Sequence, residues 1–256
     1  MSSILVFAFL FFIGSCLGWC MEVIFRRFFS KSNPDRKWIN PGFLTGPYLP
    51  LYGFGLWGMY FVSGLSRFKI TGNEAADILI VLVVMAVTMT LIEYIAGLIF
   101  IKGMNLKLWD YTNERGNIQG IICPRFSVAW GMLGCIYYFI INPYVIGWVV
   151  WLSKHLTFSF FIGMFFGIFI IDLCYSAKLS AGIQKFAKEK NIVIKYEELK
   201  EYIRKQRDLL KEKNNFIFAF KTSSPLKLHL EQYIEEAIRS ISNEVRNEIA
   251  ERKRSK

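Results

Sequence analysis

The stretch Gly42-Phe-Leu-Thr-Gly-Pro-Tyr-Leu-Pro-Leu-Tyr52 decides the fold, because a matching stretch returns seventy-four residues later. The second copy reads Gly116-Asn-Ile-Gln-Gly-Ile-Ile-Cys-Pro-Arg-Phe126, so glycine, aliphatic, proline and aromatic positions recur in register. A glutamate precedes each copy inside an apolar run, Glu22 before the first and Glu93 before the second. Helix-breaking residues beside a buried carboxylate are typical of membrane sites that bind or move something polar. The pattern predicts an internal duplication.

Composition favours a helical membrane protein. The chain is 54% hydrophobic and 17% aromatic, with a mean hydropathy of +0.34, and its apolar residues form blocks near the roughly 20 residues that cross a bilayer as helix. We therefore predict an all-α, polytopic fold in which residues 1–177 form the transmembrane domain. The five predicted spans are about Ser3–Phe25, Pro47–Leu65, Ala76–Ile101, Ile118–Ile141 and Thr157–Ala177.

The first four spans make two tandem helix pairs, over about residues 3–66 and 76–141. Two spans return a chain to its starting side, so the repeats would be related by an axis along the membrane normal. The second and fourth spans are interrupted by glycine and proline, and a run of about 19 residues reaches only about 28 Å. Each is either a complete span or a broken, re-entrant helix.

Charge predicts the orientation. The connection Arg26–Lys37 carries five basic residues against one aspartate, and the segment after the fifth span is rich in lysine. The start of the chain and the connection around Lys154 carry almost no charge. Under the positive-inside rule the N-terminus lies outside and the C-terminus in the cytoplasm.

The basic tail, residues 178–256, is predicted to be helical and cytoplasmic. Leu226–Arg252 places aliphatic residues at helical spacing, and Tyr196–Lys213 shows a weaker version of the same pattern, with Asn214–Pro225 as the break. The tail helix is a hairpin partner, a membrane-surface helix or an oligomerisation seam, the last of which would make a homo-oligomer. The net charge of +11 fits the bilayer as partner, and no nucleic-acid recognition motif accompanies it.

We single out four charged residues within the predicted spans, all in the cytoplasmic half. Glu93 lies roughly 13 Å and Asp172 roughly 9 Å from that face, at 1.5 Å per residue. Glu22 precedes Arg26 by one turn and is expected to pair with it. Arg125 is the natural partner of Glu93 or Asp172 in a single polar cluster. The cluster is either a structural ion-pair lock or a site for a substrate or proton.

The interrupted segments would complete this site, through Gly46, Pro50 and Tyr52 in one copy and Gly120 and Pro124 in the other. Proline lacks an N–H, so Pro50 is expected to leave the carbonyl of Gly46 unpaired, and tyrosine hydroxyls could serve such groups. The alternative is close helix packing through small residues such as Gly46, Gly53, Gly55 and Gly58.

Motifs for direct catalysis are missing from the sequence. There is no G-x-x-x-x-G-K-[ST] phosphate loop, no G-x-S-x-G elbow and no H-E-x-x-H. The two histidines stand alone, and Cys16 and Cys20 lack a histidine at metal-ligand spacing. We expect no catalytic residues, no metal site and no cofactor, and Asp110 is expected to cap the turn that follows it.

A family resemblance rests on these same residues. Glu22, the Gly42–Gly53 segment, Glu93, Trp109-Asp110-Tyr111 and Asn117–Cys123 resemble the family named "Putative ABC-transporter type IV", a CmpB-like group of bacterial membrane proteins. The resemblance covers about Leu17–Leu133. It implies a permease-like protein of the bacterial plasma membrane that works with a separate ATPase at its cytoplasmic face. The alternatives are a membrane scaffold that recruits partners and a proton-coupled secondary transporter.

Overall fold

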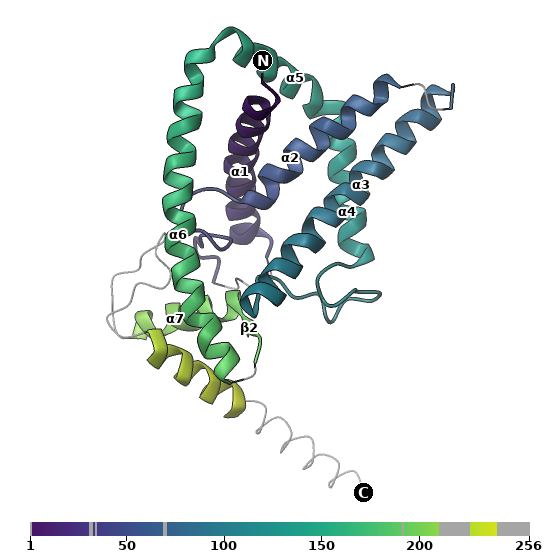
Figure 1. Ribbon diagram of the computed structural model, residues 1–256. Helices are drawn as coiled ribbons and strands as arrows, with labels where there is room; N and C mark the ends of the chain where they lie inside the picture. Colours follow the sequence, from purple (N-terminus) through teal and green to yellow (C-terminus); the bar gives the residue numbers. More distant parts are fainter. Residues whose placement is uncertain are drawn as a thin grey trace, which may run out of the picture.

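The computed structural model describes residues 2–30, 33, 35–68, 71–190, 192–209 and 226–239. It is an all-helical bundle with one short strand pair (Figure 1). The predicted break Asn214–Pro225 and the end of the predicted helix after residue 239 lie outside the described residues. The elements, in chain order, are α1 (Ser3–Phe28), α2 (Pro50–Ser63), η1 (Gly64–Arg67), α3 (Glu74–Leu98), η2 (Ile99–Gly103), β1 (Leu106–Lys107), α4 (Pro124–Ile136), η3 (Tyr137–Ile141), α5 (Asn142–Lys154), η4 (Leu156–Phe158), α6 (Ser159–Glu189), β2 (Ile194–Lys195) and α7 (Tyr196–Leu209).

Local sequence sets where these helices begin. Ser2 caps α1 by accepting a hydrogen bond from the N–H of Ile4, and Asn73 caps α3 in the same manner, as short polar side chains do at helix starts. Pro50 and Pro124 open α2 and α4, where the missing N–H costs nothing. The two prolines of the repeated pattern are therefore helix starts.

Four helical segments of the described part are long and apolar enough to cross a membrane: Ser3–Phe28, Glu74–Gly103, Pro124–Lys154 and Leu156–Glu189. The second predicted span is not among them: α2 has 14 residues, or about 21 Å of helix, and continues only through the short η1. The residues before Pro50 are an irregular loop, so the helix of this block begins at Pro50. The internal duplication stays a prediction.

The third apolar segment bends at η3, a stretch of π-helix that is followed by Pro143. Figure 1 shows α5 turning away from α4 and crossing the end of the bundle near the N-terminus. A π segment and a proline both disturb the regular backbone hydrogen bonds, which accounts for the bend. Ser63 and Tyr137 fix the corner by donating hydrogen bonds to the side-chain oxygen of Asn142, at 3.0 and 3.2 Å.

Small residues let α2 pack closely on both neighbours. A Cβ on Gly53 would lie 2.7 Å from the carbonyl oxygen of Phe11 in α1, and one on Gly55 would lie 2.8 Å from Met89 in α3. The predicted close packing through glycine is confirmed at these positions. It places α2 between α1 and α3 and sets the position of Tyr52.

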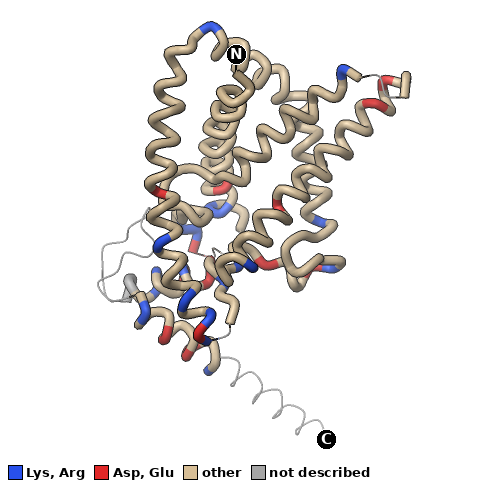
Figure 2. Tube along the Cα trace, in the orientation of Figure 1, with Lys and Arg blue, Asp and Glu red and all other residues tan. Residues whose placement is uncertain are grey.

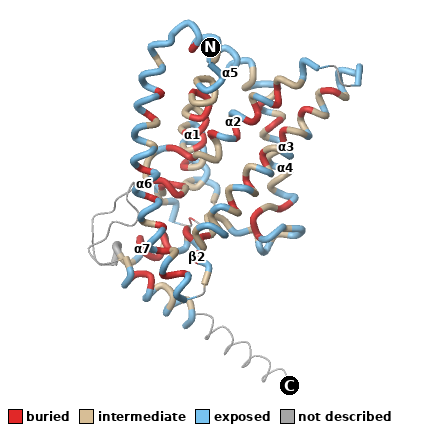
Figure 3. The backbone as a smooth tube through the Cα atoms, in the orientation of Figure 1, coloured by how far each residue is buried: buried red, intermediate tan, exposed pale blue. Residues whose placement is uncertain are grey.

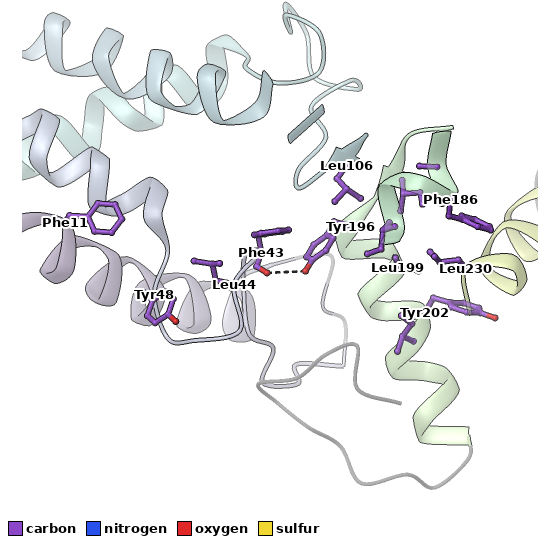
Figure 4. Packing of buried hydrophobic residues seen from close by; sticks show 14 of the residues in the cluster. Phe11, Phe43, Leu44, Tyr48, Leu106, Phe186, Tyr196, Leu199, Tyr202 and Leu230 are labelled. Carbon is purple, nitrogen blue, oxygen red and sulfur yellow. Dashed lines mark hydrogen bonds between the residues drawn. The ribbon is translucent and has the colours of Figure 1, made fainter. Parts of the chain in front are cut away.

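The end of the molecule opposite the N-terminus carries most of the charge (Figure 2). There α6 runs uninterrupted through the predicted domain boundary at residue 177, and its final turns pack with the connection after α3 and with α7. The strands β1 and β2 pair in parallel, with Leu106 opposite Ile194. A core lies beneath them and is formed by buried residues from several segments (Figures 3 and 4), among them Phe43, Leu106, Phe186, Ile194, Tyr196, Leu199, Ile203 and Leu230.

Candidate functional site

Glu93 is a buried carboxylate that only neutral groups contact. It lies on α3 with 3% of its surface exposed. One oxygen accepts a hydrogen bond from the hydroxyl of Tyr111 and the other from the indole N–H of Trp130, both at 3.0 Å. Within the described part of the chain, no lysine or arginine lies within ion-pair distance of it. Burial of a carboxylate without a countercharge is costly, so this position needs a functional explanation.

The connection between α3 and α4 holds the Tyr111 donor in place. The ring of Tyr111 stacks on Phe126, with centroids 4.3 Å apart. The indole of Trp109 donates a 2.8 Å hydrogen bond to the carbonyl of Ile121 and ties the connection back on itself. Asp110 caps the next turn by accepting from the N–H of Thr112, as predicted.

Asp110 is also an acid with an altered pKa. Its burial raises the pKa, but hydrogen bonds from Thr112 and from the ammonium of Lys107 outweigh this and lower it to about 2. The ion pairs of Asp110 with Lys107 and Lys195 join the connection to β2. Because the folded-state pKa lies below the ordinary value, these contacts stabilise the fold above about pH 4 and lose that effect as the pH falls toward 2.

Glu22 lies across an aromatic pair from Glu93. Its carboxylate accepts from Arg26 at 3.0 Å, which confirms the predicted i,i+4 pair, and from the hydroxyl of Tyr52 at 3.0 Å. The ring of Tyr52 packs on Trp130, with centroids 6.2 Å apart. Glu22, Tyr52, Trp130 and Glu93 thus form a continuous row of contacts through α1, α2, α4 and α3. We call this row the acidic–aromatic site.

Asp172 does not belong to that row. Its carboxylate lies at the loop before α2 and accepts hydrogen bonds from Thr45, Gly46 and Tyr48. Ser176, one turn further along α6, donates to it as well. The expectation of one cluster that contains all the intramembrane charges is therefore wrong.

Arg125 also lies elsewhere. It pairs with Glu114 at 3.1 Å, and 74% of its side chain is exposed. The expected pairing with Glu93 or Asp172 is wrong because α4 starts at Pro124, which keeps Arg125 in the first turn beside the connection. The cation next to the acidic–aromatic site is instead Arg26.

The repeated glycine–proline segments have paired backbones. The carbonyl of Gly46 accepts a 2.9 Å hydrogen bond from the N–H of Tyr48, so the expectation that Pro50 leaves it unpaired is wrong. Gly120 has a φ of +67°, a conformation that glycine adopts most readily. Its N–H donates to the side chain of Asn117, and its carbonyl accepts from Tyr111. Gly120 therefore holds Tyr111 in place beside Glu93.

Helix α7 reaches the acidic–aromatic site from the tail. Glu197 accepts from Arg26 at 2.7 Å and from Lys200 at 3.3 Å. The ammonium of Lys200 also donates to the carbonyls of Asn40 and Gly42, at 3.0 and 3.1 Å. Burial alone would raise the pKa of Glu197, but Lys200 and Arg26 outweigh it and hold that pKa below its ordinary value. Sequence reasoning missed this contact because 171 residues separate Glu197 from Arg26.

We expect Glu197→Gln to release α7 from the connection between α1 and α2. The loss of charge leaves Arg26 and Lys200 without their shared anion, which we expect to cost about 1–3 kcal/mol for a pair that is not fully buried. Limited proteolysis and hydrogen exchange in α7 would measure the release. Glu201→Gln is the matched control, because Glu201 forms its ion pair with Lys205 of the same helix. Equal protection in both variants would contradict the role of Glu197.

The described residues contain no group of three or more histidine, cysteine, aspartate or glutamate side chains that could hold a metal ion. The five cysteines are unpaired. The acidic–aromatic site and its neighbour Arg26 supply two carboxylates, a guanidinium and aromatic rings. These groups bind cations or protons and position polar ligands.

Long apolar helices around buried carboxylates define the class: this is a polytopic helical membrane protein. The family model described as "Putative ABC-transporter type IV" matches residues 9–177, well over half of the chain. The chain belongs to this family. No curated protein and no solved structure matches it.

Proposed function

We propose that this protein is the permease-like subunit of a bacterial ABC-type transporter and that the acidic–aromatic site binds the small substrate it moves. One observation carries the proposal. Glu93 is almost fully buried, has neutral donors at both oxygens, and lies in contact with the Tyr52–Trp130 pair. A carboxylate in such surroundings lowers the stability of the protein, and membrane helices that contain one usually use it for transport or binding.

The chemistry of the site favours a cationic group or a proton as what it receives. The two carboxylates supply negative charge, and the rings of Tyr52 and Trp130, packed edge to face, lie between them. Aromatic faces attract cations more strongly once water is removed. Arg26 neutralises Glu22 in this structure, which leaves Glu93 as the acid that a substrate or proton would compensate.

The proposed orientation places this site near the cytoplasm. The basic connection after α1, the connection after α3 and α7 share one end of the molecule (Figure 2), and the positive-inside rule assigns that end to the cytoplasm. The N-terminus would then lie outside the plasma membrane. A substrate at Glu93 would be close to release into, or capture from, the cytoplasm.

A separate ATPase would supply the energy at the same end. The sequence has no phosphate loop of its own. Helix α7 contacts the first connection at Asn40, Gly42 and Phe43. In the connection between α3 and α4, Arg115 and Ile118 are exposed, as is Arg125 at the start of α4. The connection between α3 and α4 also carries Tyr111, a direct contact of Glu93. An ATPase that docks there could therefore change the site through Tyr111.

Purification from native membranes in a mild detergent tests the proposal. We expect an ATPase to co-elute with the tagged protein in fixed ratio and to be lost when the exposed residues Arg115 and Ile118 are replaced by glutamate. An unrelated tagged membrane protein from the same cells is the control. Elution of the protein alone would contradict the ABC-type proposal and favour a proton-coupled secondary transporter, while elution with partners other than an ATPase would favour a scaffold.

A further inference from the structure

The loop before α2 gathers hydrogen-bond donors around one point. The N–H of Thr45 lies 3.2 Å and its hydroxyl 2.5 Å from one oxygen of Asp172. The N–H of Gly46 lies 2.8 Å and the hydroxyl of Tyr48 lies 2.6 Å from the other oxygen. We call these four donors of Thr45, Gly46 and Tyr48 the Thr45 cradle. Convergent neutral donors of this kind match the acceptor oxygens of a carboxylate or an oxyanion.

The acceptor comes from a different part of the chain. Asp172 lies on α6, 127 residues beyond Thr45, and only 8% of its surface is exposed. It enters the cradle as a carboxylate borne on a side chain, in the same way that the carboxylate of a free ligand would enter. Tyr48 is itself held in place by edge-on packing against Phe165 and Phe169.

The two copies of the repeated pattern provide different acceptors for the N–H of their second glycine. At the position that corresponds to Gly46, the N–H of Gly120 donates to the side chain of Asn117, a residue of the same connection. The position that corresponds to Asn117 in the first copy is Phe43, which has no acceptor in its side chain. In the first copy the N–H of Gly46 donates instead to Asp172, a residue of α6.

We propose that the Thr45 cradle is a binding site for a small carboxylate or inorganic oxyanion, and that Asp172 occupies it in this structure as an internal substitute. A free anion would compete with Asp172 for the same four donors. Because Asp172 belongs to α6, occupancy of the cradle by a ligand would release this point of attachment between α6 and the loop. This second site differs from the acidic–aromatic site in both location and ligand charge, so it does not depend on the proposed function.

Chemical rescue of Asp172→Ala tests the cradle. We expect the purified variant to unfold at a lower temperature than the parent protein and to regain stability, saturably, when sodium formate is added. Sodium chloride at the same ionic strength controls for salt. Adding Tyr48→Phe and Thr45→Ala to the variant should remove the response to formate. Asp172→Asn is the matched control, since its amide keeps the cradle filled and should show no rescue.

Two results would overturn the proposal. One is a folded Asp172→Ala protein whose unfolding temperature formate leaves unchanged or raises no more than chloride does. The other applies if Asp172→Ala fails to accumulate in membranes. Growth in medium with formate should then restore the amount of the variant, and an unchanged amount would refute anion binding by the cradle. Phosphate and acetate, tested in place of formate, would separate an oxyanion site from one that accepts carboxylates alone.

Discussion

Replacing Glu93 with glutamine should abolish function while the protein still folds. Glutamine has nearly the shape of glutamate, and its carbonyl can keep one of the two hydrogen bonds that Tyr111 and Trp130 donate. Loss of the other leaves a buried donor unsatisfied, which costs about 1–3 kcal/mol. No cation of the described residues is stranded by the change, so the larger penalty of a broken buried ion pair does not apply. The carboxylate charge is lost completely.

Complementation of a strain that lacks the chain would measure the effect, with the amount of folded protein followed by fluorescence-detected gel filtration. We expect at least a tenfold loss of function at near-normal protein levels. Glu114→Gln is the control, because Glu114 pairs with the exposed Arg125 outside the site. A folded and fully active Glu93→Gln protein would exclude a transport role for Glu93. A protein that fails to accumulate would instead support a structural role.

Replacing Gly53 with alanine should separate α1 from α2. A Cβ there would lie 2.3 Å from the hydroxyl oxygen of Ser15 and 2.7 Å from the carbonyl oxygen of Phe11. The second contact is with backbone, which cannot rotate away, so the helices must move apart. Overpacking of this kind typically costs about 1–3 kcal/mol. The same movement would pull Tyr52 from Glu22, so function should fall together with stability.

The unfolding temperature of the detergent-purified protein measures the loss of stability. Gly147→Ala is the matched control, because nothing lies within 4 Å of the position its Cβ would take, and we expect it to be close to neutral. Equal stability of the two variants would show that α1 and α2 can separate at little cost. The position of Tyr52 would then need another explanation.

Much of the fold follows from local sequence. Apolar length gives the helices, because backbone groups in a bilayer must pair within their own segment. Pro50 and Pro124 mark the starts of α2 and α4, since proline is accepted in the first turn. The i,i+4 pair of Glu22 and Arg26 follows from helical spacing alone. The family membership could be predicted from the repeated motifs, and the match over residues 9–177 confirms it.

The partners of the buried acids could not be predicted in this way. Depth in the membrane placed Arg125 near Glu93 and Asp172, but depth says nothing about which way a side chain faces around its helix. The rotation of α4 turns Trp130 toward Glu93, while Arg125 remains at the exposed first turn. Trp130 had no signal of its own among the many aromatic residues. Tyr111 did stand out, as part of the Trp109-Asp110-Tyr111 motif.

The sequence by itself determined that this is a helical membrane protein and which acids lie within its apolar segments. These properties depend on hydrophobic length and spacing along one helix, both of which are local. Only the tertiary structure decided that Glu22 and Glu93 meet across Tyr52 and Trp130, that Asp172 fills the loop before α2, and that Glu197 ties α7 to Arg26. Those contacts join residues far apart in the chain, and their geometry is set by how the helices pack against one another.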